Sequence, residues 1–161
     1  MAASFPAHHS QSPTAADASA VRGAADAGAE AAAERGDAAL TAALIHALGS
    51  IGGASSRRLG GLRGLFHPAA GEVPFGVVSR GGVFFKTGPD TVTKYIARGM
   101  RPLRLAGDRQ PLRDYWRVPP DVIDGAELLP LWATRAVDAA RQFGRRRPGK
   151  LKRRRRDAAD R

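Results

Sequence analysis

Arginine is the residue type whose number and spacing in this sequence could do chemistry. Towards the C-terminus, nine basic residues fall within twelve positions. Guanidinium groups bind phosphates through paired hydrogen bonds, and clustered cations displace the counterions of a nucleic acid. The nine residues are Arg145, Arg146, Arg147, Lys150, Lys152, Arg153, Arg154, Arg155 and Arg156. They predict DNA or RNA binding without sequence preference, with a merely solvated tail as the alternative interpretation.

A second group of arginines lies in the middle of the chain. Arg57, Arg58 and Arg63 flank three glycines, so a glycine-rich strand pair could hold an anion or contact a partner there. The Gly-Lys-Ser/Thr ending of a phosphate-binding loop is absent, which excludes the usual nucleotide-hydrolase motif. Trp116 lies in a predicted strand and could stack on a base if it is exposed. Strand geometry for the glycines and core packing for the tryptophan are the competing structural interpretations.

Other residue patterns that could support chemistry are weak. The sequence contains no cysteine, which excludes disulfides, thiolate zinc sites and cysteine nucleophiles. The four histidines are scattered without metal-ligand spacing, and most carboxylates fall at predicted turns and helix starts, where capping explains them. We therefore expect no metal, no cofactor and no catalytic site. An enzyme whose site is not recognisable from the sequence is the remaining alternative.

Composition and charge divide the chain into three segments. Residues 1–37 are rich in Ala, Ser, Gly and Pro with a net charge of −3, which predicts a disordered arm. Residues 38–144 have a net charge of +6 and enough apolar residues for one modest domain. Residues 145–161 have a net charge of +8, which predicts a basic disordered tail.

The same composition suggests where the protein works. No apolar run approaches the length that spans a bilayer, and no secretory signal is visible at the N-terminus. Arginine greatly outnumbers lysine and alanine is abundant, as in proteins from GC-rich genomes. We expect a soluble cytoplasmic protein, of bacterial origin, that does not bind membranes.

Hydrophobic periodicity and turn residues predict alternating helices and strands within the domain. Asp37 is expected to cap the first helix, and Val73, Phe75 and Val77 are expected to share one face of a strand. Helices are predicted over 38–48, 90–98, 121–124 and 126–143, and strands over 55–59, 64–67, 73–79, 83–86, 101–105 and 111–117.

The short turns between consecutive strands require an antiparallel sheet. Helices are available to cover one of its faces, so the sequence predicts an α+β two-layer sandwich with helices on one face. Its element order is α-β(3-4)-α-β(2)-α. Because consecutive strand residues face opposite sides, either Tyr115 or Trp116 should pack under the helices.

Several segments of the domain follow a known family pattern. These are the glycine-rich strand pair at 55–66, the hairpin strands at 75–78 and 83–86, the helix exit at 95–103, the Tyr-Trp-Arg-Val-Pro run at 115–119, and Trp132-Ala133 in the last helix. In this order they resemble the N-terminal domain of the TfoX/Sxy family. The sequence is too short to include the second domain that full-length members carry, so a stand-alone N-terminal domain is expected.

The resemblance implies a regulatory and non-enzymatic role. Full-length members of the family co-regulate the genes of DNA-uptake competence together with the cyclic-AMP receptor protein. We therefore expect a protein partner, such as a transcription complex, with nucleic-acid affinity added by the tail. The alternative is a general DNA- or RNA-associated protein in which the tail alone does the binding.

Overall fold

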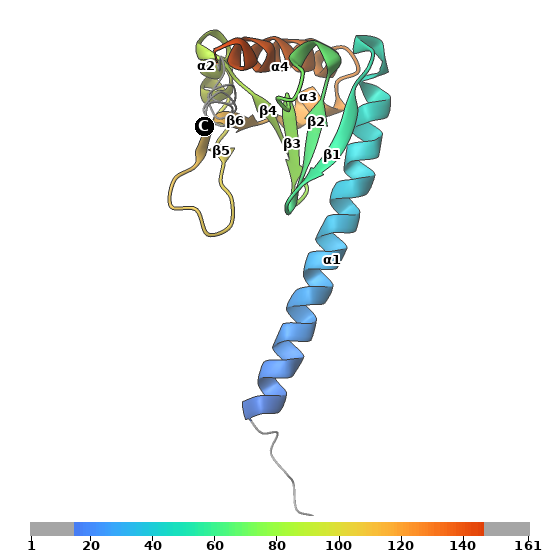
Figure 1. The fold of residues 1–161 in the computed structure, drawn as a ribbon, viewed down its shortest axis with the longest axis vertical. Coiled ribbons are helices and arrows are strands. Elements are labelled where there is room, and N and C mark those ends of the chain that lie inside the picture. The colour runs from blue at the N-terminus through green and yellow to red at the C-terminus, as the bar shows by residue number, and fades with distance from the viewer. Residues whose placement is uncertain (1–14, 147–161) are drawn as a thin grey trace, which may run out of the picture.

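The structure is a computed structural model that describes the backbone of residues 15–146 and the side chains of residues 26–146. It confirms the α+β class, because helices pack on an antiparallel six-stranded sheet of order β1-β2-β3-β4-β6-β5 (Figure 1). The helical elements are α1 (Ala15–Ala47), η1 (Gly49–Ile51), η2 (Pro68–Ala70), α2 (Pro89–Ala97), α3 (Pro120–Asp124) and α4 (Leu128–Arg145). The strands are β1 (Ser55–Leu59), β2 (Leu62–Phe66), β3 (Gly76–Ser79), β4 (Gly82–Lys86), β5 (Pro102–Leu103) and β6 (Leu112–Arg117).

Tight turns make consecutive strands pair. The turn between β3 and β4 holds Arg80 at φ 49° and Gly81 at φ 72°, the two positive values that a type I′ hairpin turn requires. The predicted second hairpin is also present, since β5 pairs antiparallel with β6. Strand β6 pairs on its other side with β4, which joins both halves of the domain in one sheet.

The strand register sorts the side chains into two faces, because directly paired residues lie on the same side of a sheet. Leu65, Gly76, Phe85 and Trp116 form one such row. Leu65 and Phe85 belong to the buried core cluster, and Trp116 packs against it. We call this side the helix face.

The helices bury their apolar side chains in that same cluster. Helix α4 contributes most of them, α1 contributes Leu44, and Leu48 follows directly after the end of α1. Tyr95 of α2 packs edge-on against Trp132 of α4 with ring centroids 4.8 Å apart. The predicted packing of the helices on one face of the sheet is thus confirmed.

The first helix is much longer than the sequence indicated. Residues 15–37, which we assigned to a disordered arm, form the first two thirds of α1, and this part projects past the hairpin tips (Figure 1). Side chains 26–36 are all exposed, so tertiary packing does not hold them in the helix. Alanine has the highest helix propensity, and the packed end of α1 supplies the nucleus from which the helix continues.

Asp37 has a different role from the predicted N-cap, because α1 runs straight through it. The Asp37 side chain is buried, and its two carboxylate oxygens accept hydrogen bonds of 2.7 Å from the backbone N–H groups of Arg80 and Gly81. The residue therefore caps the β3–β4 turn and ties α1 to the tip of this hairpin.

The third strand also differs from its prediction. It begins at Gly76, so Phe75 precedes the strand and packs in the core cluster, 6.0 Å from Phe85 between ring centroids. Val77 lies on the side of the sheet opposite the helix face. The predicted common face of Val73, Phe75 and Val77 is therefore wrong, because the chain leaves regular strand geometry before residue 76.

Candidate nucleic-acid and partner surfaces

The three central arginines point to different sides of the sheet. Arg58 pairs across β1–β2 with Arg63, and Arg63 pairs with the core residue Val78, so both arginines lie on the helix face. Arg57 lies on the opposite face, where its guanidinium carbon sits 3.9 Å from the centre of the Phe66 ring. The sheet thus brings Arg58 and Arg63 together and separates them from Arg57.

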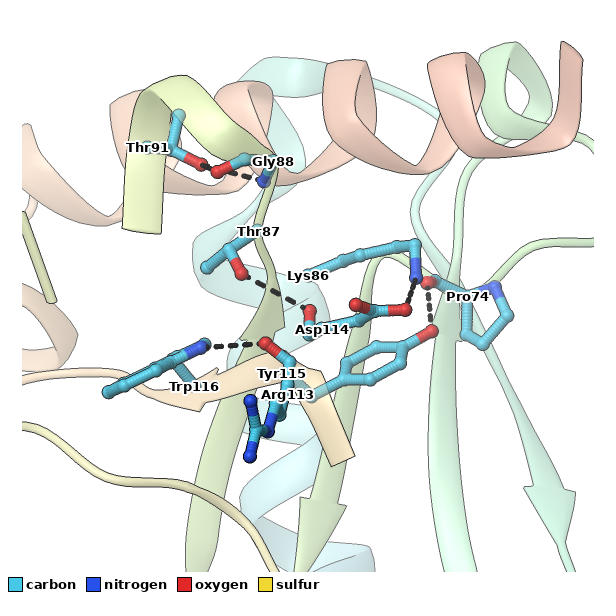
Figure 2. A network of polar contacts seen from close by, with 9 residues as sticks. All are labelled: Pro74, Lys86, Thr87, Gly88, Thr91, Arg113, Asp114, Tyr115 and Trp116. Carbon is cyan, nitrogen blue, oxygen red and sulfur yellow. Dashed lines mark hydrogen bonds and ion pairs between the residues drawn. The ribbon is translucent and has the colours of Figure 1, made fainter. Parts of the chain in front are cut away.

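Trp116 is remote from all three arginines. It lies on β6, three strands away from β2, which corresponds to about 14 Å across the sheet. Its ring is half-buried against the core, and its indole N–H donates to the carbonyl oxygen of Arg113 at 2.8 Å (Figure 2). It faces the helix layer and is only partly exposed, and its predicted role in base stacking stays a prediction.

Only the start of the basic tail belongs to the described part of the chain. Arg145 is the last residue of α4 and Arg146 follows it as the C-cap, and both are exposed. The other seven tail residues, from Arg147 to Arg156, lie outside the described residues. The predicted role of the tail therefore stays a prediction.

Arg58 and Arg63 line an open groove between α1 and the hairpin tips. The α1 wall of the groove has acidic side chains at successive helical turns, namely Asp26, Glu30, Glu34 and Asp37. The facing wall has the arginines Arg58, Arg63, Arg80 and Arg104. The Glu34 carboxylate pairs with the Arg58 guanidinium at 2.7 Å. The two walls balance each other in charge, so a polyanion on the arginines would meet repulsion from the helix.

The side of the sheet opposite the helix face carries a different row of side chains. Arg57, Gly64, Val77, Phe84 and Arg117 are paired in succession across β1, β2, β3, β4 and β6. None of these residues belongs to the core cluster that the helices fill. We call this side of the sheet the open face. Its central row is apolar in the middle and cationic at both ends.

Glycines let the large side chains of the open face lie flat on the sheet. A Cβ atom at Gly82 would come within 2.8 Å of the Phe84 ring, and one at Gly64 within 2.8 Å of the Phe66 ring. The Phe66 ring is buried because the Arg57 guanidinium covers it, whereas Phe84 remains half-buried without such a cover in this row. Phe84 is therefore the aromatic side chain of the row that a ligand can reach.

A buried lysine, which the sequence analysis did not single out, lies at the end of β4. The Lys86 side chain is 4% exposed, and its ammonium group lies 3.6 Å from an oxygen of Asp114 (Figure 2). The ammonium also lies 4.6 Å from the Tyr115 ring centre and 4.0 Å from that of Phe143. These cation–π and ionic contacts stabilise a charge that burial would otherwise penalise, and they join β4, β6 and α4.

Tyr115 completes this network. Its hydroxyl donates a 2.9 Å hydrogen bond to the carbonyl oxygen of Pro74, as Figure 2 shows. Burial, and secondarily the neighbouring Asp114 carboxylate, raises the pKa of Tyr115 to about 12. The pocket beside Lys86, between α2 and α4, has a volume of only about 10 Å³. That volume accommodates about one water molecule, so the network works as a structural tie with no space for a substrate.

The described residues contain no cluster of three or more His, Asp or Glu side chains that could hold a metal ion. His67 has a structural role, because its Nδ1 atom accepts a hydrogen bond from the backbone N–H of Ala69 and caps η2. Within residues 15–146, no helix combines the length and apolar character needed to cross a membrane.

Comparison with protein families identifies the domain. The family model of the TfoX N-terminal domain matches residues 46–140, which is more than half of the chain. The chain belongs to the TfoX N-terminal domain family. The match runs from the end of α1 to α4 and includes all six strands, so the predicted TfoX resemblance is confirmed over the whole sheet. The comparisons with curated proteins and with solved structures each found no match.

Proposed function

We propose that this TfoX N-terminal domain protein is a non-enzymatic regulator or adaptor. In this proposal the folded domain binds a protein partner, such as a transcription complex that controls DNA-uptake competence genes in the cytoplasm. The basic tail adds nucleic-acid affinity without sequence preference. The observation that carries the proposal is the family match, which covers the whole sheet and the helices packed on it.

The use of acidic side chains supports a non-enzymatic role. A general acid or base needs a carboxylate that is free to exchange a proton with a substrate. In the described residues, ion pairs or backbone hydrogen bonds engage the carboxylates of Glu34, Asp37, Glu72, Asp114, Asp121 and Asp138. These contacts give the six carboxylates structural roles within and between helices, strands and turns. The other six described carboxylates are exposed, namely Asp26, Glu30, Asp90, Asp108, Asp124 and Glu127.

The first experiment tests the protein partner. We expect the full chain and a chain ending at Arg146 to bind a purified cyclic-AMP receptor protein–promoter complex equally well in surface plasmon resonance. The same promoter DNA without the receptor protein is the control surface. If neither chain prefers the complex to the bare DNA, the adaptor proposal is wrong for this partner.

The second experiment tests the tail with a fluorescent DNA duplex and an RNA across a salt series. The nine basic residues predict a steep fall of affinity with salt, by up to about eight powers of the salt concentration for duplex DNA. The chain ending at Arg146 should lose most of this dependence. Undiminished duplex binding by the shortened chain would contradict the role of the tail. If only the tail binds anything, the general nucleic-acid-associated alternative is favoured.

A further inference from the structure

The open face of the sheet has the chemistry of a second, separate nucleic-acid site. Arg57, Phe84 and Arg117 are the accessible members of its central row, and Gly64 and Val77 form the floor between them. We propose that this row binds single-stranded nucleic acid, with a base stacked on Phe84 and phosphates held by Arg57 and Arg117.

The distances across the sheet suit such a ligand. Neighbouring strands lie about 4.8 Å apart, so Phe84 on β4 is about one strand spacing from Arg117 on β6 and about three spacings from Arg57 on β1. A strand of nucleic acid crossing the sheet would therefore meet a cation, an aromatic ring and a second cation in turn. Cationic grooves with aromatic platforms are how proteins bind single strands without reading sequence.

The ring of Phe84 is held in a suitable orientation. Gly82, its neighbour two positions back along β4, has no Cβ, and a Cβ there would lie 2.8 Å from the far edge of the ring. The ring therefore lies over the backbone of the strand and presents its other side away from the sheet. A base has a π face whatever its identity, so stacking here would tolerate any sequence.

The charge of the open face favours a polyanion. Arg113, Tyr115 and Arg117 occupy every second position of β6, so Arg113 lies on the same side of the sheet as Arg117. Among the described residues, the carboxylate that pairs with the row is that of Glu72, 2.9 Å from Arg57, and its side chain is 87% exposed. An exposed pair of this kind is weak, so a phosphate can replace the carboxylate. This distinguishes the open face from the groove beside α1, whose arginines face an acidic helix.

The proposal goes beyond the tail, so its test removes the contribution of the tail. The parent is the full-length chain in which the seven basic tail residues beyond Arg146 are replaced by Gln, namely Arg147, Lys150, Lys152, Arg153, Arg154, Arg155 and Arg156. The probe is a fluorescent oligothymidylate of about 12 nucleotides, a length within the range that one domain of this size binds. The same oligonucleotide annealed to its complement is the comparison ligand. We expect the parent to bind the single strand more tightly than the duplex.

Two variants then locate the site. Phe84→Leu keeps an apolar side chain but removes the π face, and we expect about tenfold weaker binding of the single strand. The double variant Arg57→Gln/Arg117→Gln should lower the slope of log affinity against log salt by about 1.4. The matched control is Arg98→Gln/Arg141→Gln, which removes the same charge from exposed positions at the end of α2 and in α4, and it should leave affinity and slope nearly unchanged.

The outcomes test the proposal independently of the tail, because the parent chain lacks the basic residues of the tail beyond Arg146. If the parent fails to bind the single strand, or if Phe84→Leu binds as tightly as the parent, the open face is not a stacking site. If the control loses as much as the Arg57/Arg117 variant, binding follows net charge alone and the proposal is wrong. Circular dichroism checks each variant, and if Phe84→Leu unfolds the chain, the arginine variant and its control decide. If Phe84→Leu instead weakens binding of the protein partner, the open face is a protein-docking surface.

Discussion

Asp37 shows at the scale of a residue what sequence reasoning can and cannot reach. Its residue type and its place before an apolar helical stripe predict an N-cap of the first helix, which is wrong because α1 runs through the residue. The group that it caps lies 43 and 44 positions away, at Arg80 and Gly81. No local pattern reports such a contact, because it depends on where α1 crosses the β3–β4 hairpin. The same limit hid Phe84, whose place on the open face follows from the register of β3, β4 and β6.

Replacing Asp37 by Ala should destabilise the domain by about 2 kcal/mol. The change removes two charge-assisted hydrogen bonds and leaves the partly buried N–H groups of Arg80 and Gly81 without acceptors. Urea unfolding followed by circular dichroism measures the loss as a lower midpoint. Asp124→Ala is the control, since this exposed carboxylate should change stability by less than about 0.5 kcal/mol. An equal effect of both substitutions would refute the capping role.

The two tyrosines predict how stability changes at high pH. Burial raises the pKa of Tyr95, and burial together with Asp114 raises the pKa of Tyr115 to about 12, both above the ordinary value of about 10. A raised pKa means that the folded state favours the neutral hydroxyl. The stabilisation that the two neutral hydroxyls contribute is fully present below about pH 10. It is lost as the pH rises through the pKa values of the tyrosines in the folded state.

Tyrosinate absorbance measures this directly, because the chain contains only these two tyrosines. In denaturant both should ionise with a midpoint near pH 10. In the native protein the absorbance should stay low at that pH and rise only as the helical circular dichroism is lost. Ionisation near pH 10 with unchanged circular dichroism would show that the two hydroxyls are not buried as the structure has them.

At the scale of elements, the sequence predicts most of the sheet but not the length of α1. Glycine and turn residues in the sequence locate the hairpins correctly. In the β3–β4 turn the structure has positive φ values at Arg80 and Gly81, as a two-residue hairpin turn requires. Helix α4 also follows its apolar periodicity, and it accommodates Pro130 in its first turn, where no intrahelical N–H is lost. The projecting part of α1 lacks an apolar face, so periodicity could not reveal it. Alanine propensity alone favours a helix there.

Gly36→Ala should stabilise the projecting part of α1. A Cβ at Gly36 would meet no atom within 4 Å, and alanine is favoured over glycine inside a helix by about 1 kcal/mol. Hydrogen exchange of the amides in residues 26–36 should slow about fivefold, while exchange in the sheet stays unchanged. The contrasting variant is Gly125→Ala, whose Cβ would lie 2.9 Å from the backbone oxygen of Asp121 and should lower the melting temperature. Unchanged exchange in Gly36→Ala would contradict a continuous helix in solution.

At the scale of the whole molecule, the family match and the register answer different questions. The resemblance reaches the family and its fold, because both follow from the order of motifs along the chain, whereas the regulatory role is our proposal. It does not reach the division of charge between the two faces, which only the pairing of six strands determines. Alternation along β1 already puts Arg57 and Arg58 on opposite sides, but only the strand pairing shows that Arg58 is the one on the helix face.

The melting temperature distinguishes a ligand bound by the tail from one bound by the open face. A ligand stabilises a fold only if it binds the folded state better than the unfolded state. Duplex DNA held by the tail should bind both states alike and shift the melting temperature of the full chain by less than about 1 °C. The open face exists only in the folded chain, so a single strand at about ten times its dissociation constant should stabilise it by about 1.4 kcal/mol.

For a domain of this size, that stabilisation corresponds to an increase of about 6 °C in the melting temperature. Differential scanning fluorimetry of the full chain with oligothymidylate or with duplex measures both values under one set of conditions. Phe84→Leu should lose most of the increase while keeping its own melting temperature close to that of the unmodified chain. Equal shifts with single strand and duplex would show that binding depends on net charge alone, because a stacking site on Phe84 should favour the single strand.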